Sequence, residues 1–222
     1  QSVMEDALSK LLRTEISITG AGRTDTGVHA NQMFAHFDHY DQISNKLLYK
    51  LNAFLPNSIA IRHIHRVKDD AHARFDAVSR SYTYIIEREK NPFNFDFAYY
   101  YKKALNIDLM KKACEILFEY ENFKCFSRSN TDVRTYNCKL MHAEWKLTET
   151  HLVFDIKADR FLRNMVRAIV GTMLEIGNEK ISLEELRKII NSKNRSQAGP
   201  SAPAYGLFLT EIEYPKHIFI ND

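Results

Sequence analysis

The sequence has few cysteines: only three among 222 residues, and none of them forms a C-x-x-C pair. An odd number of thiols without such a pair disfavours a disulfide framework or a zinc ribbon, so a reducing cytoplasm is the expected compartment. Long hydrophobic runs are also missing, because no segment approaches the roughly 18 consecutive apolar residues of a membrane helix. We therefore expect no association with a membrane.

A strong excess of one charge is absent as well. The 31 Lys and Arg residues against 28 Asp and Glu give a net charge of +3, which permits a nucleic-acid partner without requiring one. The hydrophobic content of 45% supplies a core and disfavours a long disordered chain. The length allows one large domain or two of about 100 residues each.

The second half of the sequence has the clearest periodic patterns. They predict strands at 81–87, 136–148, 152–158 and 207–214, and helices at 109–119, 161–176 and 183–190. Ser182 and Glu185 form a capping-box pattern before the last of these helices. The order β-α-β-β-α-(α)-β is that of a ferredoxin-like, split βαβ unit.

The first half shows the same order with its first strand absent. Helices are expected at 2–13 and 44–54, and strands at 15–19, 32–38 and 59–67. We predict an α+β protein with two ferredoxin-like domains, residues 1–72 and 73–222, each with an antiparallel sheet and helices on one face. An active-site cleft is expected between them.

The start of the chain adds a separate expectation. The sequence begins at Gln1 rather than at a methionine, already inside a predicted helix, and its first residues do not resemble a signal peptide. We expect a longer protein from which the first strand is missing. The expected strands at 15–19 and 59–67 should then show a gap or be rearranged, unless another chain or an altered pairing fills the place.

The most informative segment is the glycine-punctuated loop over residues 20–30, GAGRTDTGVHA. Its glycines allow positive φ and close approach of a ligand, and Asp25 is its carboxylate. Taken alone, Asp25 could be an Asx-turn residue, or a metal ligand together with His29 and His36. A phosphate-binding loop is disfavoured because G-K-[ST] is missing, and a hydrolase triad because no nucleophile elbow is present.

The run GRTDTGVHA resembles the signature of the tRNA pseudouridine synthase A family, usually G-R-T-D-A-G-V-H. Further segments resemble that family in the same order along nearly the whole chain: LNAFLP at 51–56, HARFDA at 72–77, RSYTY at 80–84, FLRNMVR at 161–167 and AGPSAP at 198–203. The resemblance implies an isomerase that converts uridine to pseudouridine at positions 38–40 in the anticodon stem-loop of tRNA. It also implies a homodimer and the use of no cofactor or metal.

The resemblance assigns roles residue by residue. Asp25 occupies the position of the nucleophile, and Arg167 that of the arginine that pairs with it, where a bidentate guanidinium would aim the carboxylate. Tyr82 matches an active-site tyrosine whose ring can stack on the extruded uracil, and whose hydroxyl, near the sugar, could instead act as a general base at C2′. Leu207 matches an apolar residue that packs against the base, although taken alone it is an ordinary core leucine.

RNA binding is expected to involve basic side chains. Arg23, beside the nucleophile, is expected to enter the RNA and fill the gap that the flipped uridine leaves. Other cations that could follow the phosphate backbone are Arg74, Arg80, Arg163, Arg128, Arg134, Lys157 and Arg160. A rival interpretation is a non-catalytic RNA-binding module that stacks bases on Phe34, Tyr82, Tyr84 and Phe208. Asp25 argues against a pure binder, because a carboxylate would repel phosphate.

Overall fold

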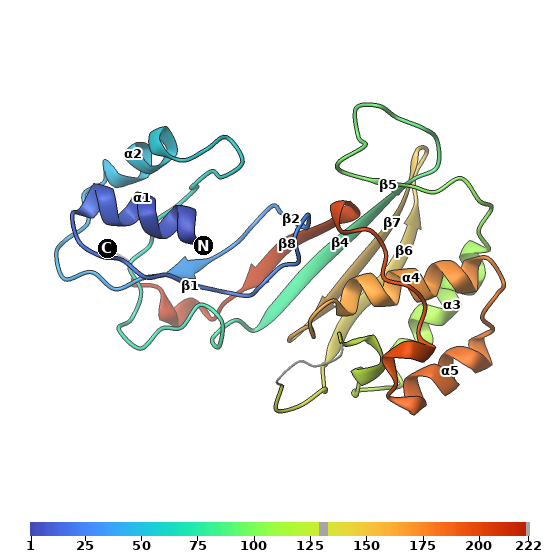
Figure 1. Cartoon of the computed structure of the whole chain (residues 1–222). Helices are drawn as coiled ribbons and strands as arrows, with labels where there is room; N and C mark the ends of the chain where they lie inside the picture. The colour runs from blue at the N-terminus through green and yellow to red at the C-terminus, as the bar shows by residue number, and fades with distance from the viewer. Residues whose placement is uncertain (129–132, 221–222) are drawn as a thin grey trace. The chain divides into compact units, whose positions relative to one another are not determined.

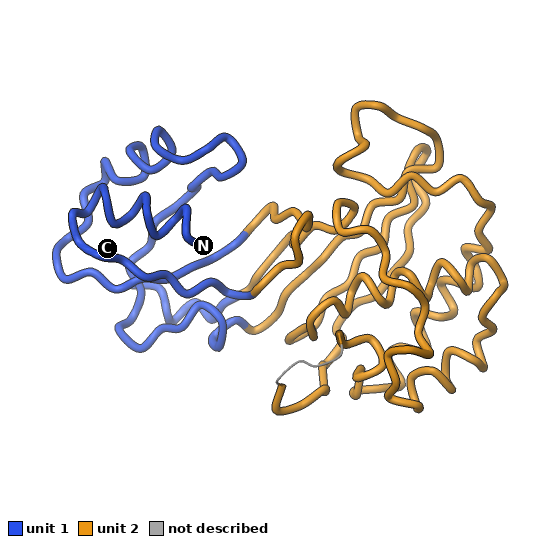
Figure 2. Tube along the Cα trace, viewed as in Figure 1, with its two compact units in different colours: residues 1–22, 33–77, 214–222 blue, residues 23–32, 78–213 orange. Residues whose placement is uncertain are grey.

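The computed structural model describes residues 1–128 and 133–220, and the chain divides into two compact units (Figure 2). Unit 1 comprises Gln1–Gly22, Met33–Ala77 and Tyr214–Asp222, and unit 2 comprises Arg23–Gln32 and Val78–Glu213. Neither unit is one continuous range, which differs from the expected division at 72 and 73. The loop with Asp25 therefore belongs to the unit formed mainly by the second half.

Unit 2 is built on one six-stranded sheet (Figure 1). Its strands are β2 (His29–Ala30), β4 (Ser79–Glu87), β5 (Tyr99–Tyr100), β6 (Leu140–Leu147), β7 (His151–Ala158) and β8 (Leu207–Glu213). The order is β2-β8-β4-β7-β6, with β5 also paired to β4. The four long strands pair antiparallel, whereas β2 lies parallel to β8 and β5 parallel to β4.

The sheet of unit 2 is therefore mixed, and the expectation of a purely antiparallel sheet is wrong. The two parallel pairings come from two-residue strands contributed by loop segments. Such short segments carry no hydrophobic alternation, so the direction in which they join a sheet is not visible in the sequence.

Three helices cover one face of this sheet: α3 (Ile107–Leu117), α4 (Met165–Gly177) and α5 (Leu183–Ser192). The capping box at Ser182 and Glu185 is present. Helix α3 begins two residues before the expected start at 109, and the Asn106 side chain caps it by accepting a hydrogen bond from the backbone N–H of Leu109. In β7, alternate residues are buried against the helices, as a half-buried strand requires: Leu152, Phe154, Ile156 and Ala158.

Unit 1 is smaller and less regular. Helices α1 (Ser2–Leu12) and α2 (Leu47–Phe54) enclose a small apolar core, and β1 (Thr19–Gly20) pairs antiparallel with β3 (Ala35–His36). Thus the strands expected at 15–19 and 32–38 shorten to two residues each.

The strand expected at 59–67 does not form in unit 1. Within the described residues 59–66 no strand is present, and Val67 makes only an isolated bridge to Phe219. The physical reason lies at Ile61, whose backbone N–H donates to Asn52 Oδ1 at 2.7 Å and whose carbonyl accepts from Asn52 Nδ2 at 2.8 Å. A side chain thus satisfies the backbone groups that a neighbouring strand would otherwise pair.

Among the described residues, no helix has both the length and the apolar character needed to cross a membrane.

Candidate active site

Asp25 lies at the first position of a tight turn that leads into β2. The backbone N–H of Val28 donates to the Asp25 carbonyl at 3.1 Å, and Gly27 has a φ of 85°. A positive φ at the third position of such a turn is one that glycine adopts without strain. The parallel pairing of β2 with β8, His29 opposite Phe208, then fixes the end of the turn to the sheet. The local sequence therefore places Asp25 on a defined support.

Arg167, in the first turn of α4, contacts Asp25 directly. Its NH1 group donates to Asp25 Oδ2 at 2.8 Å, and each side chain is 21% exposed. The two residues that were expected to pair are therefore in contact. The geometry differs from the bidentate form expected, because the Arg167 Nε–H donates instead to the backbone carbonyl of Ala202 at 2.7 Å. The guanidinium is thus shared between a carboxylate and a peptide carbonyl.

Tyr82, on β4, is half-buried, and its ring forms a T-shaped pair with that of Phe161, with 5.2 Å between the centroids. Burial raises the pKa of Tyr82 to about 12, Arg80 opposes this shift, and the charge of Asp25 adds to it. The hydroxyl is therefore protonated near neutral pH, and proton abstraction by this tyrosine is disfavoured. This environment favours a role for the aromatic ring of Tyr82 over a role for its hydroxyl.

Tyr84, two residues further along the same strand, is a core residue. It is 0% exposed, and its hydroxyl donates to the carbonyl of Pro203 at 2.9 Å. Burial raises its pKa as well. The interior position of Tyr84 does not support its part in the aromatic RNA platform of the rival interpretation.

The other predicted site residues lie in different surroundings. Leu207 is 5% exposed and belongs to the main core of unit 2, so the structure places it as a core leucine. Arg23 and Arg163 are exposed, whereas Arg80 donates to the carbonyl of Asp159 at 2.9 Å. Arg74 belongs to unit 1, where its guanidinium lies 5.6 Å from the ring centroid of Phe75.

The metal-site interpretation is not supported by the arrangement of the side chains. Among the described residues, no three His, Cys, Asp or Glu side chains are grouped so as to hold a metal ion. His36 belongs to unit 1 and its Nδ1 accepts from the backbone N–H of Ala73 at 3.0 Å. His29 instead bonds the carbonyl of Asp96 at 2.8 Å and stacks on Phe208.

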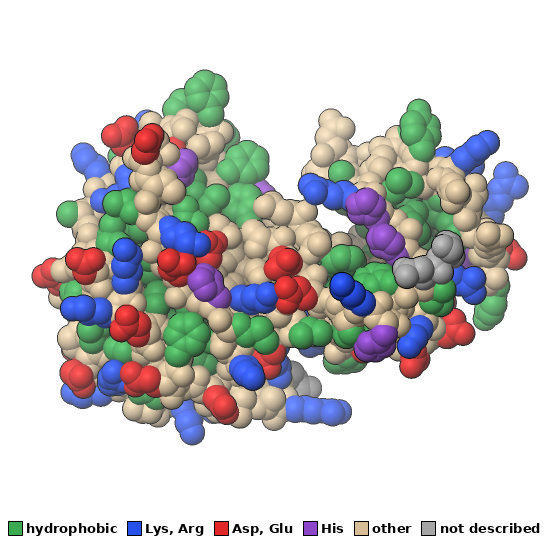
Figure 3. Space-filling view, turned by 180° about the vertical axis from the view of Figure 1, so that it is seen from behind, with side chains coloured by type: hydrophobic (Ala, Val, Ile, Leu, Met, Phe, Trp, Pro, Cys, Tyr) green, Lys and Arg blue, Asp and Glu red, His purple; other side chains and the backbone are tan. Residues whose placement is uncertain are grey.

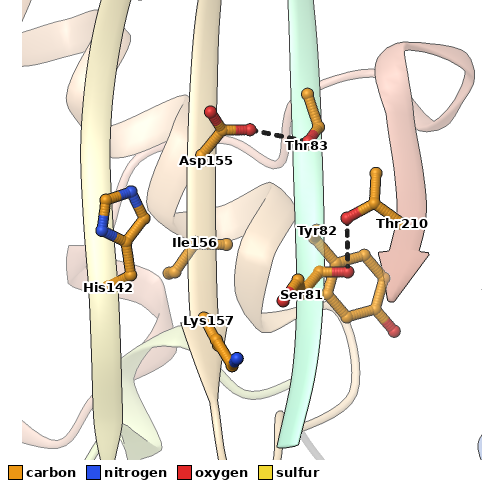
Figure 4. A pocket seen from close by; sticks show the side chains of 8 residues that line it. All are labelled: Ser81, Tyr82, Thr83, His142, Asp155, Ile156, Lys157 and Thr210. Atoms are coloured by element: carbon orange, nitrogen blue, oxygen red, sulfur yellow. Dashed lines mark hydrogen bonds between the residues drawn. The ribbon is translucent and has the colours of Figure 1, made fainter. Parts of the chain in front are cut away.

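The open face of the unit 2 sheet carries a pocket of about 230 Å³ (Figure 4). Its polar side chains are already bonded: Thr83 donates to Asp155 at 2.7 Å, and Thr210 to the carbonyl of Ser81 at 3.1 Å. Acidic and basic side chains lie side by side on the face seen in Figure 3. This pocket has the character of a solvated sheet surface.

The sequence predicted no separate role for the loop at 198–203, which bonds the side chain of Arg167. The motif at 198–203 entered only as part of the resemblance, yet Ala202 binds Arg167 through two backbone groups. Main-chain ligands leave no mark on residue type, so no local signal could have identified them.

A carboxylate in a glycine-containing turn, held by a helix arginine beside a half-buried tyrosine, is a candidate catalytic centre. A family model described as tRNA pseudouridine synthase matches residues 117–215, so this part of the chain is similar to that class of protein.

Full-length relatives narrow that class. The chain is 47% identical to tRNA pseudouridine synthase A of Parabacteroides distasonis over 99% of this chain and 88% of that protein. It is 48% identical to the protein of the same name from Bacteroides thetaiotaomicron, over 100% of this chain and 84% of that protein. It is 36% identical to the protein of the same name from Bacillus subtilis, over 96% of this chain and 89% of that protein. The chain belongs to the tRNA pseudouridine synthase A family.

Proposed function

We propose that this protein converts uridine to pseudouridine at positions 38–40 in the anticodon stem-loop of tRNA, with Asp25 as the nucleophile. As a member of its family it is a tRNA pseudouridine synthase, an intramolecular isomerase. The observation that carries the catalytic assignment is the contact between Asp25 and Arg167, 2.8 Å long, in a turn supported by the sheet.

The chemistry suits a carboxylate. The reaction breaks the N1–C1′ bond, turns the uracil and rejoins it through C5. Attack at C1′ and attack at uracil C6 both need an ionised carboxylate that can form a covalent bond and then leave, and assistance to a glycal route also uses the ionised form. Arg167 serves this group by holding it in one orientation, because its own position is fixed by the Ala202 carbonyl.

Access to the uridine requires that the base leave its stack. In the proposal, Arg23 takes the vacated space and the ring of Tyr82 stacks on the extruded uracil. For Leu207, at the start of β8, the resemblance implies support of the base from the apolar side, although its side chain belongs to the core of unit 2. The exposure of Arg23 and the protonated state of the Tyr82 hydroxyl favour these roles.

Binding of tRNA would use Arg74, Arg80 and Arg163 as phosphate contacts. The proposal also retains a homodimer with the tRNA lying across both subunits, two ferredoxin-like domains and a cytoplasmic location. The burial of all three cysteines, Cys114, Cys125 and Cys138, is compatible with a reducing compartment. No metal or small-molecule cofactor is part of the proposed reaction.

The direct test of this function is the release of tritium from uridine labelled at C5, because C5 loses its hydrogen when it bonds to C1′. A tRNA transcript labelled at all uridines should release tritium, and a matched transcript with cytidine at positions 38–40 should not. Absence of release from the first transcript would contradict the activity, and equal release from both would contradict the assigned positions.

A further inference from the structure

The segment Ala198–Gly206, here called the strap, packs against α4 more closely than side chains allow. A Cβ atom placed on Gly171 would lie 1.6 Å from the carbonyl oxygen of Pro200, and one on Gly199 would lie 2.8 Å from Cα of Thr172. The backbone N–H of Gly199 donates to the Thr172 hydroxyl at 2.9 Å. The two glycines thus bring the strap into backbone contact with the helix that carries Arg167.

The strap holds Arg167 at both ends. The side-chain Nε–H of Arg167 donates to the carbonyl of Ala202 at 2.7 Å, and the backbone N–H of Ala202 donates to the backbone carbonyl of Arg167 at 2.9 Å. The direction in which the guanidinium points at Asp25 therefore depends on the position of one residue of the strap.

Arg195 fixes the residues that surround Ala202. Its NH1 group donates to the carbonyl of Gly199 at 3.0 Å, and its NH2 group donates to the hydroxyl of Ser201 at 2.9 Å. The same hydroxyl accepts from Nδ2 of Asn164, at the start of α4, at 2.6 Å. A serine oxygen has two lone pairs and can accept both bonds, so Ser201 is held from two sides.

We propose that Arg195 is a positioning residue for the isomerisation. It holds the strap so that the Ala202 carbonyl aims Arg167 at Asp25, while the guanidinium of Arg195 makes its own hydrogen bonds, among the described residues, to strap atoms. The inference rests on the proposed function of Asp25 and Arg167. A planar guanidinium suits the task, because it can bond two differently placed acceptors at fixed angles, which a lysine ammonium cannot do as rigidly.

Two substitutions test the inference through kinetics. Arg195→Met keeps the apolar stem, and kcat should fall about 10- to 100-fold with the tRNA KM within about threefold, because small misplacements of catalytic groups lower the rate steeply. Ser201→Ala should lower kcat in the same direction, and Ser201→Thr, which keeps a hydroxyl, should restore it. Arg187→Met is the matched control, since Arg187 on α5 pairs with Glu119 and Glu184 and should leave kcat unchanged.

A merely structural role would give a different result. It would lower the melting temperature of Arg195→Met and leave kcat of the folded protein intact, and that outcome would overturn the inference. The Nε–H resonance of Arg167, assigned by its loss in Arg167→Met, should shift in ligand-free Arg195→Met and stay in place in Arg187→Met. An unchanged resonance would also contradict the inference.

The double variant separates this inference from the proposed function. In an Arg167→Met background, Arg195→Met should cause no further loss of rate, and a full additional loss would show that Arg195 acts by another route. If Asp25→Asn keeps its activity, the proposed function fails. If Asp25→Asn and Arg167→Met are inactive while Arg195→Met and Ser201→Ala are normal, only the role of Arg195 fails.

Discussion

Two carboxylate–cation contacts in unit 2 have similar lengths and different surroundings. Asp25 accepts from Arg167 at 2.8 Å on the helix-covered side, and Asp155 accepts from Lys146 at 3.2 Å on the open face of the sheet. Asp25 and Arg167 are each 21% exposed, whereas Lys146 is 50% exposed. Length alone therefore does not distinguish a site from a solvated surface.

The difference lies in what fixes the cation. Arg167 is anchored by the Ala202 carbonyl, whereas Lys146 is divided between Asp155 and Glu144 on a flexible stem. Exposed pairs of the second kind contribute about 0–1 kcal/mol and are screened by salt. We infer that a pre-positioned cation is the feature that marks the first pair as functional.

Loss of the anchored cation should have a large effect. Arg167→Met keeps an apolar side chain and removes the partner of Asp25, so turnover of tRNA should fall on the order of 100-fold or more with little change in stability. Lys146→Met, the equivalent change on the open face, should leave turnover within about twofold. Equal effects of the two substitutions on single-turnover rates would remove the distinction between the pairs.

A loss of rate of intermediate size is expected for substitutions of Tyr82, whose pKa is raised in part by the charge of Asp25. Tyr82→Phe should lower the rate less than tenfold, because the hydroxyl, with a pKa of about 12, stays protonated and the ring still stacks. Tyr82→Leu, which removes the ring, should cost more. A loss of about 100-fold in Tyr82→Phe would instead assign proton transfer to the hydroxyl.

The smallest effect is expected from a substitution on the open face of the sheet, that of Glu213, and it concerns the stability of the protein. The Lys157 ammonium, and then the Ser79 hydroxyl, lower the pKa of Glu213 in the folded protein. Its stabilising contribution is therefore present above the ordinary glutamate pKa and is lost as pH falls through the folded value.

Glu213→Gln should lower the unfolding free energy by about 1 kcal/mol or less near pH 7, since this side chain is 44% exposed and its ion pair is screened by solvent. The difference from the parent should be smaller at a second, acidic pH below the ordinary glutamate pKa, where the folded carboxyl becomes protonated. Urea unfolding at both pH values measures it, and a difference that grows on acidification would contradict the assigned direction.

The success of sequence reasoning also differed between the two units. The long strands and helices of unit 2 were predictable because apolar periodicity and local capping, as at Ser182, agree with the tertiary packing. Apolar and polar residues alternate just as well in the segment 59–67, but the Asn52 side chain forms hydrogen bonds with the backbone N–H and carbonyl of Ile61. A side-chain bond of that kind is decided by tertiary context and not by pattern.

The site was predictable only in part, and for a related reason. The partnership of Asp25 and Arg167 joins residues 142 positions apart, so it came from the family resemblance and from no local signal. The sharing of Arg167 with the Ala202 carbonyl could not be foreseen, because every residue carries such a carbonyl. The roles of Tyr82, Leu207 and the arginines stay predictions.

The central claim, that Asp25 is the nucleophile, is tested most directly by Asp25→Asn. This change removes the nucleophilic charge with little change in volume. Tritium release from C5-labelled tRNA should disappear, while tRNA affinity measured on the same preparation should be unchanged or slightly tighter, because a charge that repels phosphate is gone. Turnover within about tenfold of the parent protein would contradict the account.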